Sequence, residues 1–235
     1  MSSEITLEMA DRSWLDREWT EPCLQQDFIA WRKGRSRYAV WAIDLDTPDL
    51  RAACAQMQQH LAGYFLPDYE RQPHITVRIC GFPGPGNGFD DDYTPDLFKA
   101  QLIALQTAHI KPFTLSIGSP ESFTSAAYFS VHDHEGGIAS LRQALGNDGP
   151  GELDFPYVPH ISFGLYRDRF ALAEVLQHIQ SCAGPMKLQF AVKQLVLMSY
   201  EAAVIAGPLR AVCAFDLEHQ SLRLIDTGAM GALGY

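Results

Sequence analysis

Hydrophobic and polar residues alternate in some segments of this chain and recur at helical spacing in others. Alternation rich in β-branched and aromatic residues predicts strands over residues 38–45, 74–82, 113–117, 126–131, 160–166, 188–199 and 209–216. Apolar residues three and four positions apart predict helices over 95–108, 137–145 and 169–181, and a further helix that begins at Pro48 after Asp46 or Thr47. The predicted order is β-α-β-α-β-β-α-β-α-β-β.

A similar β/α unit occurs in each half of this order. The strands at 74–82 and 160–166 each follow a helix and take corresponding places in the two halves. A two-fold repeat of this length is too long for a solenoid, so it predicts two similar lobes. If the lobes face each other, these two strands lie on either side of a cleft.

The two strands begin with nearly the same tetrapeptide, Pro-His-Ile-Thr at 73–76 and Pro-His-Ile-Ser at 159–162. Because side chains alternate along a strand, His74 and Thr76 are expected on one face, and the same holds for His160 and Ser162. A single histidine on a strand is more often structural than catalytic, but a duplicated pattern at equivalent points favours function. Two imidazoles that face one cleft suit acid–base chemistry near neutral pH.

The composition is that of a globular protein with a negative net charge. Hydrophobic residues make up 47% of the 235 and charged residues 20%, which is enough for a sizeable core. The formal net charge is −10, whereas broad contact with duplex nucleic acid needs clustered lysine and arginine. A small phosphorylated ligand, or an RNA end held by a few local contacts, is compatible with this charge.

The cysteines and the first residues indicate a reduced, cytoplasmic protein. The five cysteines are scattered and include no C-x-x-C pair, so we expect free and mostly buried thiols. Residues 1–19 are polar and acidic and lack the apolar core of a signal peptide. No run approaches the roughly 18 apolar residues of a membrane span.

Three segments of the chain differ in character. Residues 1–37 contain three of the four tryptophans, too many for a free tail, so we expect this extension to pack on the body. Residues 38–220 contain the repeat and form the predicted main domain. Residues 221–235 are predicted to be a loosely held tail.

Two H-x-[ST] motifs, one at the start of a strand in each half, resemble the signature of the 2H phosphoesterase superfamily. The best-known branch of that superfamily is the LigT-like group of 2′-5′ RNA ligases and RNA 2′,3′-cyclic phosphodiesterases. His74 and His160 lie 86 residues apart, which is compatible with one motif per lobe. The resemblance extends from about Tyr38 to about Leu217 and includes the segments YAVWAIDLD, PHITV with Gly81 after it, PFTLSIGSPESF and PHISFGLY.

The resemblance implies an α/β (α+β) bilobal fold, with two pseudo-symmetric antiparallel β-sheets around a central groove and helices outside. His74 and Thr76 would then face His160 and Ser162 across the groove. Serine in the second motif, where many members have threonine, fits the H-x-[ST] pattern.

Two imidazoles on opposite sides of a phosphorus suit cleavage of a phosphodiester without a metal ion or other cofactor. One histidine would activate water while the other protonates the departing ribose oxygen, and the sequence leaves the two roles unassigned. The hydroxyls of Thr76 and Ser162 would donate hydrogen bonds to the nonbridging oxygens. We therefore expect a monomeric, metal-independent phosphodiesterase that hydrolyses a 2′,3′-cyclic phosphate or a 2′-5′ linkage in a nucleotide or at an RNA 3′ end.

Two alternative functions would use the same groove. The reverse reaction would make the chain a 2′-5′ RNA ligase. A module that binds nucleotides or RNA ends without turnover would keep the groove but not the chemistry.

Three further residues are candidates for contacts with the substrate. Arg78 continues the alternation of His74 and Thr76, which predicts that all three share a face and that the guanidinium holds a phosphate. A salt bridge from Arg78 to a carboxylate is the structural alternative. Tyr157, just before the second motif, and Phe123, in a loop-like stretch, are candidates for stacking on a base.

Two other patterns suggest metal-dependent chemistry. Asp44 and Asp46 follow a strand and resemble the D-x-D-x-T motif of haloacid-dehalogenase-like phosphatases, although a strand end and a helix N-cap explain them as well. The sequence His-Asp-His at 132–134 could join a histidine of the motifs in a metal site, whereas a solvated turn is its structural alternative.

Overall fold

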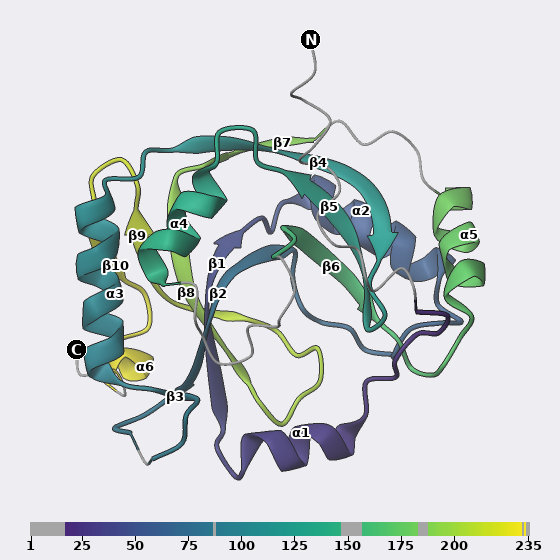
Figure 1. Cartoon of the computed structure of the whole chain (residues 1–235), viewed down its shortest axis with the longest axis horizontal. Coiled ribbons are helices and arrows are strands. Elements are labelled where there is room, and N and C mark those ends of the chain that lie inside the picture. Colours follow the sequence, from purple (N-terminus) through teal and green to yellow (C-terminus); the bar gives the residue numbers. More distant parts are fainter. Residues whose placement is uncertain (1–16, 87, 147–156, 183–187, 232, 234–235) are drawn as a thin grey trace.

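The computed structural model describes residues 17–86, 88–146, 157–182, 188–231 and 233, which form two curved sheets with helices around them (Figure 1). The helices among these residues are α1 (Gln25–Arg32), α2 (Pro48–His60), α3 (Pro95–Ala108), α4 (Gly137–Leu145), α5 (Leu172–Cys182) and α6 (Thr227–Gly231). The strands among them are β1 (Arg37–Asp44), β2 (His74–Pro83), β3 (Asp92–Tyr93), β4 (Phe113–Ser122), β5 (Ala126–His132), β6 (His160–Leu165), β7 (Gln189–Val192), β8 (Gln194–Glu201), β9 (Arg210–Asp216) and β10 (Ser221–Leu224).

Each sheet contains one of the two histidine strands. The six-stranded sheet has the order β10-β9-β8-β1-β2-β3, and the four-stranded sheet has the order β6-β5-β4-β7. Their pairings are antiparallel except for the short parallel pair of β2 with β3. Because β6 is the edge strand of its sheet and contacts β2, the two histidine strands meet where the sheets approach each other. The predicted α+β fold with two sheets is confirmed.

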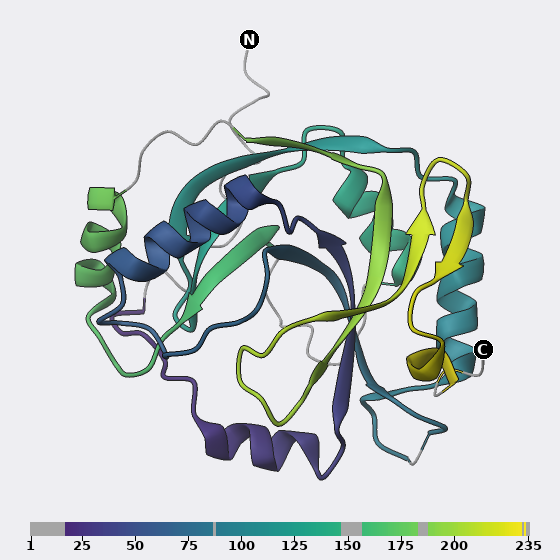
Figure 2. The same cartoon turned by 180° about the vertical axis from the view of Figure 1, so that it is seen from behind.

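Local sequence explains where the helices begin. Thr47 and Thr94 are the N-caps of α2 and α3, and their hydroxyls accept hydrogen bonds from backbone N–H groups three residues later, at 3.4 and 3.3 Å. A proline follows each cap at the first helical position. The predicted helices over 95–108 and 137–145 are confirmed to the residue. α3 and α5 cover opposite outer sides of the molecule, as both views show (Figures 1 and 2).

The main hydrophobic core fills the space between the sheets and helices. It includes Trp41 from β1, Ile75 from β2 and Ile161 from β6, each fully buried. Burial of such a side chain typically contributes about 1.5–3 kcal/mol. A second cluster, with Phe82 and the partly buried Trp31, covers the opposite face of the six-stranded sheet. The isoleucine of each motif therefore points into the core, which turns the histidine beside it toward the other face.

The described part of the N-terminal extension contacts both halves of the chain. The backbone N–H of Cys23 donates to the carbonyl of Tyr166, just after β6, at 2.9 Å. Farther along, α1 brings the ring of Trp31 to 4.9 Å from the ring of Phe82, measured between centroids, near the end of β2. The sequence pattern had not predicted α1.

The C-terminal part of the chain differs from the predicted elements in two places. The segment 188–199 is two strands, because the chain leaves the four-stranded sheet after β7 and enters the six-stranded sheet at β8, with Lys193 between them. Residues 221–231, predicted to be loosely held, form β10, which pairs with β9, and α6. The fully buried Met230 and Leu233 anchor this end of the chain.

Candidate active site

A small cavity lies between the two histidine strands. Its volume is about 170 Å³, and its lining residues are Tyr69, Arg71, His74, Thr76, His160, Ser162 and Leu165. The structure thus brings the four predicted catalytic residues to one cavity, two from β2 and two from β6.

The two imidazoles are held in the same way. Nδ1 of His74 lies 2.8 Å from the carbonyl oxygen of Gln72, and Nδ1 of His160 lies 2.7 Å from the carbonyl oxygen of Val158. A carbonyl only accepts, so each Nδ1 carries the hydrogen and donates it. Nε2 of each ring is therefore the nitrogen that can take up or release a proton.

Burial favours the neutral form of both histidines. It lowers the pKa of His74 from 6.5 to about 4; the hydrogen bond to Gln72 opposes this shift, and the charge of Arg71 and the neighbouring His160 add to it. Burial also lowers the pKa of His160, against the opposing effect of its hydrogen bond to Val158. A bound phosphate anion would raise the pKa of either ring, because an opposite charge stabilises the imidazolium.

A β-bulge in β2 follows the first motif. Thr76 pairs with Ala42 of β1, whereas Arg78 pairs with Trp41, so Val77 is an extra residue in β2. Paired residues share a face, and the consecutive Trp41 and Ala42 point to opposite faces. Arg78 therefore lies on the core face, and the prediction that it shares a face with Thr76 is wrong because the bulge interrupts the alternation.

A β-bulge also follows the second motif. Ser162 pairs with Tyr128 of β5, whereas Gly164 pairs with Ala127, so Phe163 is the extra residue in β6. The internal repeat thus extends beyond the H-x-[ST] tetrapeptide to a bulge one residue after each hydroxyl. Gly164, like Arg78 in β2, lies on the face of its strand opposite to the cavity.

Arg78 and Gly164, which follow the two bulges, make different contacts on the core face. The guanidinium of Arg78 donates to the carbonyl of Gly146, the residue that ends α4. Gly164 leaves room for the ring of Phe65, which a Cβ at position 164 would approach to 2.6 Å. Neither residue is among those that line the histidine cavity.

Tyr157 supports the backbone of the first motif. Its hydroxyl donates a 2.7 Å hydrogen bond to the carbonyl of Thr76. The guanidinium carbon of Arg142, from α4, lies 3.8 Å from the centroid of the Tyr157 ring, and Nη1 of the same arginine donates to the carbonyl of Val77 at 2.7 Å. The backbone of the bulge is therefore held by two side chains from the other half of the chain.

Phe123 lies against the second histidine. Its ring centroid is 5.0 Å from that of His160, with the rings at 85°, and it stacks on Tyr128 at 4.0 Å. Tyr128 itself meets His160 at 5.5 Å. Two aromatic rings therefore flank His160, whereas Arg71 lies on the side of His74.

Tyr69 and Arg71 were missed by reasoning from the sequence. Both lie in the irregular segment between α2 and β2, where no period marks a face. The hydroxyl of Tyr69 donates to the carbonyl of Ser162 at 3.1 Å, and burial raises the pKa of this phenol. The signal that the sequence did offer was proximity to His74, which carries little information alone.

The patterns that suggested metal chemistry lie outside the cavity. Asp46 pairs with Arg51 and precedes the N-cap of α2, which matches the structural alternative. The rings of His132 and His134 stack at 6.0 Å at the end of β5. Within the described ranges, no three histidine, cysteine, aspartate or glutamate side chains are grouped as a metal site would require.

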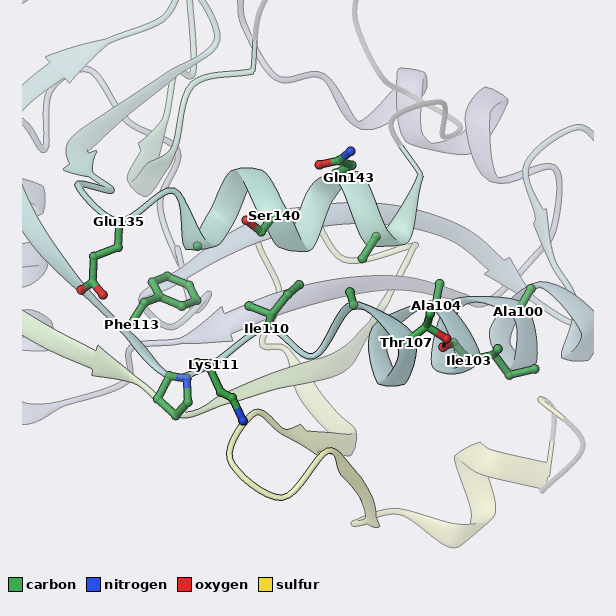
Figure 3. A pocket seen from close by; sticks show the side chains of 14 residues that line it. Ala100, Ile103, Ala104, Thr107, Ile110, Lys111, Phe113, Glu135, Ser140 and Gln143 are labelled. Carbon is green, nitrogen blue, oxygen red and sulfur yellow. Dashed lines mark hydrogen bonds between the residues drawn. The ribbon is translucent and has the colours of Figure 1, made fainter.

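A larger hollow of about 750 Å³ lies between α3 and α4 (Figure 3). Its lining is mostly small or apolar, with Ile103, Ile110 and Phe113 among the residues, and Glu135 stands at one end. That carboxylate accepts a hydrogen bond from the backbone of Thr114 at 2.8 Å. The hollow offers no pair of acid–base groups comparable to the two histidines.

In the part of the chain that the structure covers, no helix has the length and apolar character to cross a membrane.

Comparison with known proteins identifies one family. The model of the 2′-5′ RNA ligase superfamily matches residues 38–203, which include both motifs. No curated protein matches the chain.

Several solved structures are similar to this chain. Escherichia coli LigT complexed with ATP has a TM-score of 0.48 at 17% identity, with 78% of this chain and 99% of that chain covered. The same protein complexed with 3′-AMP has a TM-score of 0.48 at 19% identity, over 75% of this chain and 94% of that one. TT0787 of Thermus thermophilus has a TM-score of 0.46 at 16% identity, over 77% and 97%.

Proposed function

The chain belongs to the 2′-5′ RNA ligase superfamily, within the 2H phosphoesterases, and on that premise we propose that it is a metal-independent phosphodiesterase. Its proposed substrates are 2′,3′-cyclic phosphates, or 2′-5′ linkages, of nucleotides and RNA 3′ ends. The observation that carries the proposal is the pair His74 and His160 in one cavity, each with Nδ1 bound to a backbone carbonyl and Nε2 left to react.

The proposed step is an in-line displacement at phosphorus. Nε2 of one neutral imidazole takes a proton from water as the water oxygen bonds to phosphorus. The other imidazole, protonated in the complex, gives its proton to the ribose oxygen as the bond from phosphorus to that oxygen breaks. The product is a phosphomonoester and a free ribose hydroxyl, and the two histidines have exchanged protonation states.

The hydroxyls of Thr76 and Ser162 supply hydrogen bonds to the nonbridging oxygens. Both line the cavity on the same strand faces as the histidines. Donors held by packed strands need little reorganisation as charge develops, which is where preorganised sites gain most. Phe123, partly exposed beside His160, is the proposed contact for a base. We assign no substrate contact to Arg78, which lies on the core face.

Hydrolysis of a 2′,3′-cyclic mononucleotide, followed by chromatography of the products with and without a chelator, tests the proposal. We expect turnover that the chelator leaves unchanged. His74→Ala and His160→Ala should each lower kcat by about 10²–10⁴-fold, the usual contribution of a proton-transfer group. Full activity in both single variants would refute the mechanism, and loss of activity with the chelator would favour a metal enzyme.

A second candidate is the reverse reaction, because the matched family is described as an RNA ligase superfamily. RNA fragments with a 2′,3′-cyclic phosphate and a 5′-hydroxyl end would then be joined through a 2′-5′ linkage. Binding of nucleotides without turnover in either direction would instead indicate a non-catalytic module. A cytoplasmic location and a monomeric state stay predictions from the sequence.

A further inference from the structure

Arg71 brings a permanent positive charge to the histidine cavity. The other lining side chains are two hydroxyls, a phenol, a leucine and the two imidazoles, whose neutral forms burial favours. No carboxylate forms an ion pair with Arg71 among the residues that the structure covers. A guanidinium in a cavity without an acidic partner is suited to a ligand that brings the negative charge itself.

The Arg71 side chain is oriented by contacts that leave its charge uncompensated. Its Nε donates to the carbonyl of Gly207 at 3.3 Å. Its guanidinium carbon lies 4.2 Å from the centroid of the Tyr200 ring, a cation–π contact. A carbonyl dipole and an aromatic face hold the group in place without neutralising it.

The backbone around Arg71 is fixed by the turn between β8 and β9. Gln72 donates from Nε2 to the carbonyl of Leu209 at 2.7 Å and accepts from the N–H of the same residue at 2.8 Å. The N–H of Glu70 donates to the carbonyl of Ala206 at 3.1 Å. Ala206 and Leu209 thus hold the residues on either side of Arg71, and both lie beyond residue 203, where the family match ends.

Resting on the proposed function, we propose that Arg71 binds a nonbridging oxygen of the substrate phosphate and sets the preference of the site for anionic charge. Two N–H groups of a guanidinium can bind one phosphate in a fork, which a neutral hydroxyl cannot reproduce. A phosphomonoester product carries more negative charge than the cyclic diester. The arginine should therefore bind product and inorganic phosphate more strongly than substrate.

Titration calorimetry with inorganic phosphate tests this proposal without any need for turnover. Arg71→Gln should weaken phosphate binding about 10–100-fold, because it removes charge-assisted hydrogen bonds to the anion. Arg71→Lys, which keeps the charge but loses the fork, should fall between this variant and the wild type. Arg210→Gln, at an exposed position one residue after Leu209, removes the same charge and should bind phosphate as the wild type does.

Three results would overturn the assignment: no phosphate binding by the wild type, binding by Arg71→Gln within twofold of the wild type, or an equal loss in Arg210→Gln. Thermal unfolding of each variant shows whether it is folded. If Arg71→Gln does not fold, Arg71→Lys replaces it in the test, and phosphate binding by Arg71→Lys within twofold of the wild type would then overturn the assignment. With a 2′,3′-cyclic mononucleotide, Arg71→Gln should raise KM more than it lowers kcat. If the wild type binds phosphate through Arg71 but hydrolyses no cyclic phosphate, the proposed function fails and the anion site stands.

Discussion

The hydroxyl of Tyr157 donates a hydrogen bond of 2.7 Å to the backbone carbonyl of Thr76, from one half of the chain to the other. The relationship has a counterpart: the hydroxyl of Tyr69 donates to the carbonyl of Ser162 at 3.1 Å. Each tyrosine lies shortly before one motif and holds the hydroxyl residue of the other motif. Two reciprocal contacts therefore link the two histidine strands. In the proposed mechanism, the separation of these strands decides whether both histidines reach one phosphorus.

Removing either phenolic hydroxyl should impair turnover more than substrate binding. Tyr157→Phe removes the hydrogen bond to the Thr76 carbonyl, at a cost of about 0.5–1.5 kcal/mol, and allows Thr76 and its histidine to shift. We expect kcat for a cyclic mononucleotide to fall about tenfold while KM changes little, and Tyr69→Phe should act in the same direction. Tyr64→Phe is the matched control, because that hydroxyl contacts the exposed Glu174, outside the cavity. Wild-type kcat in both test variants would show that the links do not position the motifs.

The sequence predicted the four central residues of the site because strand alternation is a strong constraint over a short distance. From His74 to Thr76, and from His160 to Ser162, no irregularity intervenes. One step farther the prediction for Arg78 fails, because a bulge adds a single residue and leaves no mark in the hydrophobic pattern.

The other side of the cavity depends on contacts that are distant in sequence. Arg71 has its place because Gly207 and Tyr200 hold it, more than 120 positions later. No local pattern encodes such a contact. The same limit applies at Lys193, where the chain passes from the four-stranded sheet into the six-stranded sheet. Nothing in the apolar run from β7 to β8 indicates that its two parts pair with different sheets.

The depressed pKa of His74 predicts a pH-dependent stability. The folded protein holds this imidazole neutral with a pKa of about 4, whereas in the unfolded chain it has its ordinary value of 6.5. Between these values the unfolded state binds more protons, so stability rises with pH through this window and is lost as pH falls from about 6.5 to about 4. The contribution of His74 is at most on the order of 3 kcal/mol.

Urea denaturation at pH 7.5 and pH 5 measures this effect in the wild type and in His74→Gln, which cannot titrate. Arg71 and His160 face the imidazole and favour its neutral form, and both are present in the two proteins, so their own effects largely cancel in the comparison. We expect the loss of stability between the two pH values to be smaller in His74→Gln. An equal loss in both proteins would mean that His74 is not held neutral by burial.

Gly164 should be intolerant of even one added methyl group. A Cβ there would lie 2.6 Å from ring carbons of Phe65, which itself packs edge-on against Phe163 at 6.1 Å between centroids. Overpacking of this kind typically costs about 1–3 kcal/mol, so Gly164→Ala should lower the free energy of unfolding by that amount. Gly84→Ala is the control, since a Cβ at position 84 meets no heavy atom within 4 Å. Equal stability of the two variants, measured by chemical denaturation, would contradict the close contact.

Arg35 should contribute more to stability than its ion pair alone suggests. Its guanidinium carbon lies 3.6 Å from the centroid of the Phe82 ring, and Nη2 donates to Asp91 at 2.9 Å, with only 13% of the side chain exposed. Arg35→Ala would leave Asp91 without this partner and uncover the ring, so we expect a loss of about 2 kcal/mol or more.

Arg51 forms the matching case at the surface, because it also pairs with an aspartate, Asp46, through two nitrogens, but 63% of its side chain is exposed. Water and salt screen such a pair, so Arg51→Ala should change stability little. Urea denaturation of the two variants in low and in high salt compares the two ion pairs. It shows whether the buried contact between the N-terminal extension and the loop before β3 stabilises the fold more than an ordinary surface ion pair does. Equal effects at positions 35 and 51, or an Arg35→Ala loss that disappears in high salt, would show that the extension is not held by this contact.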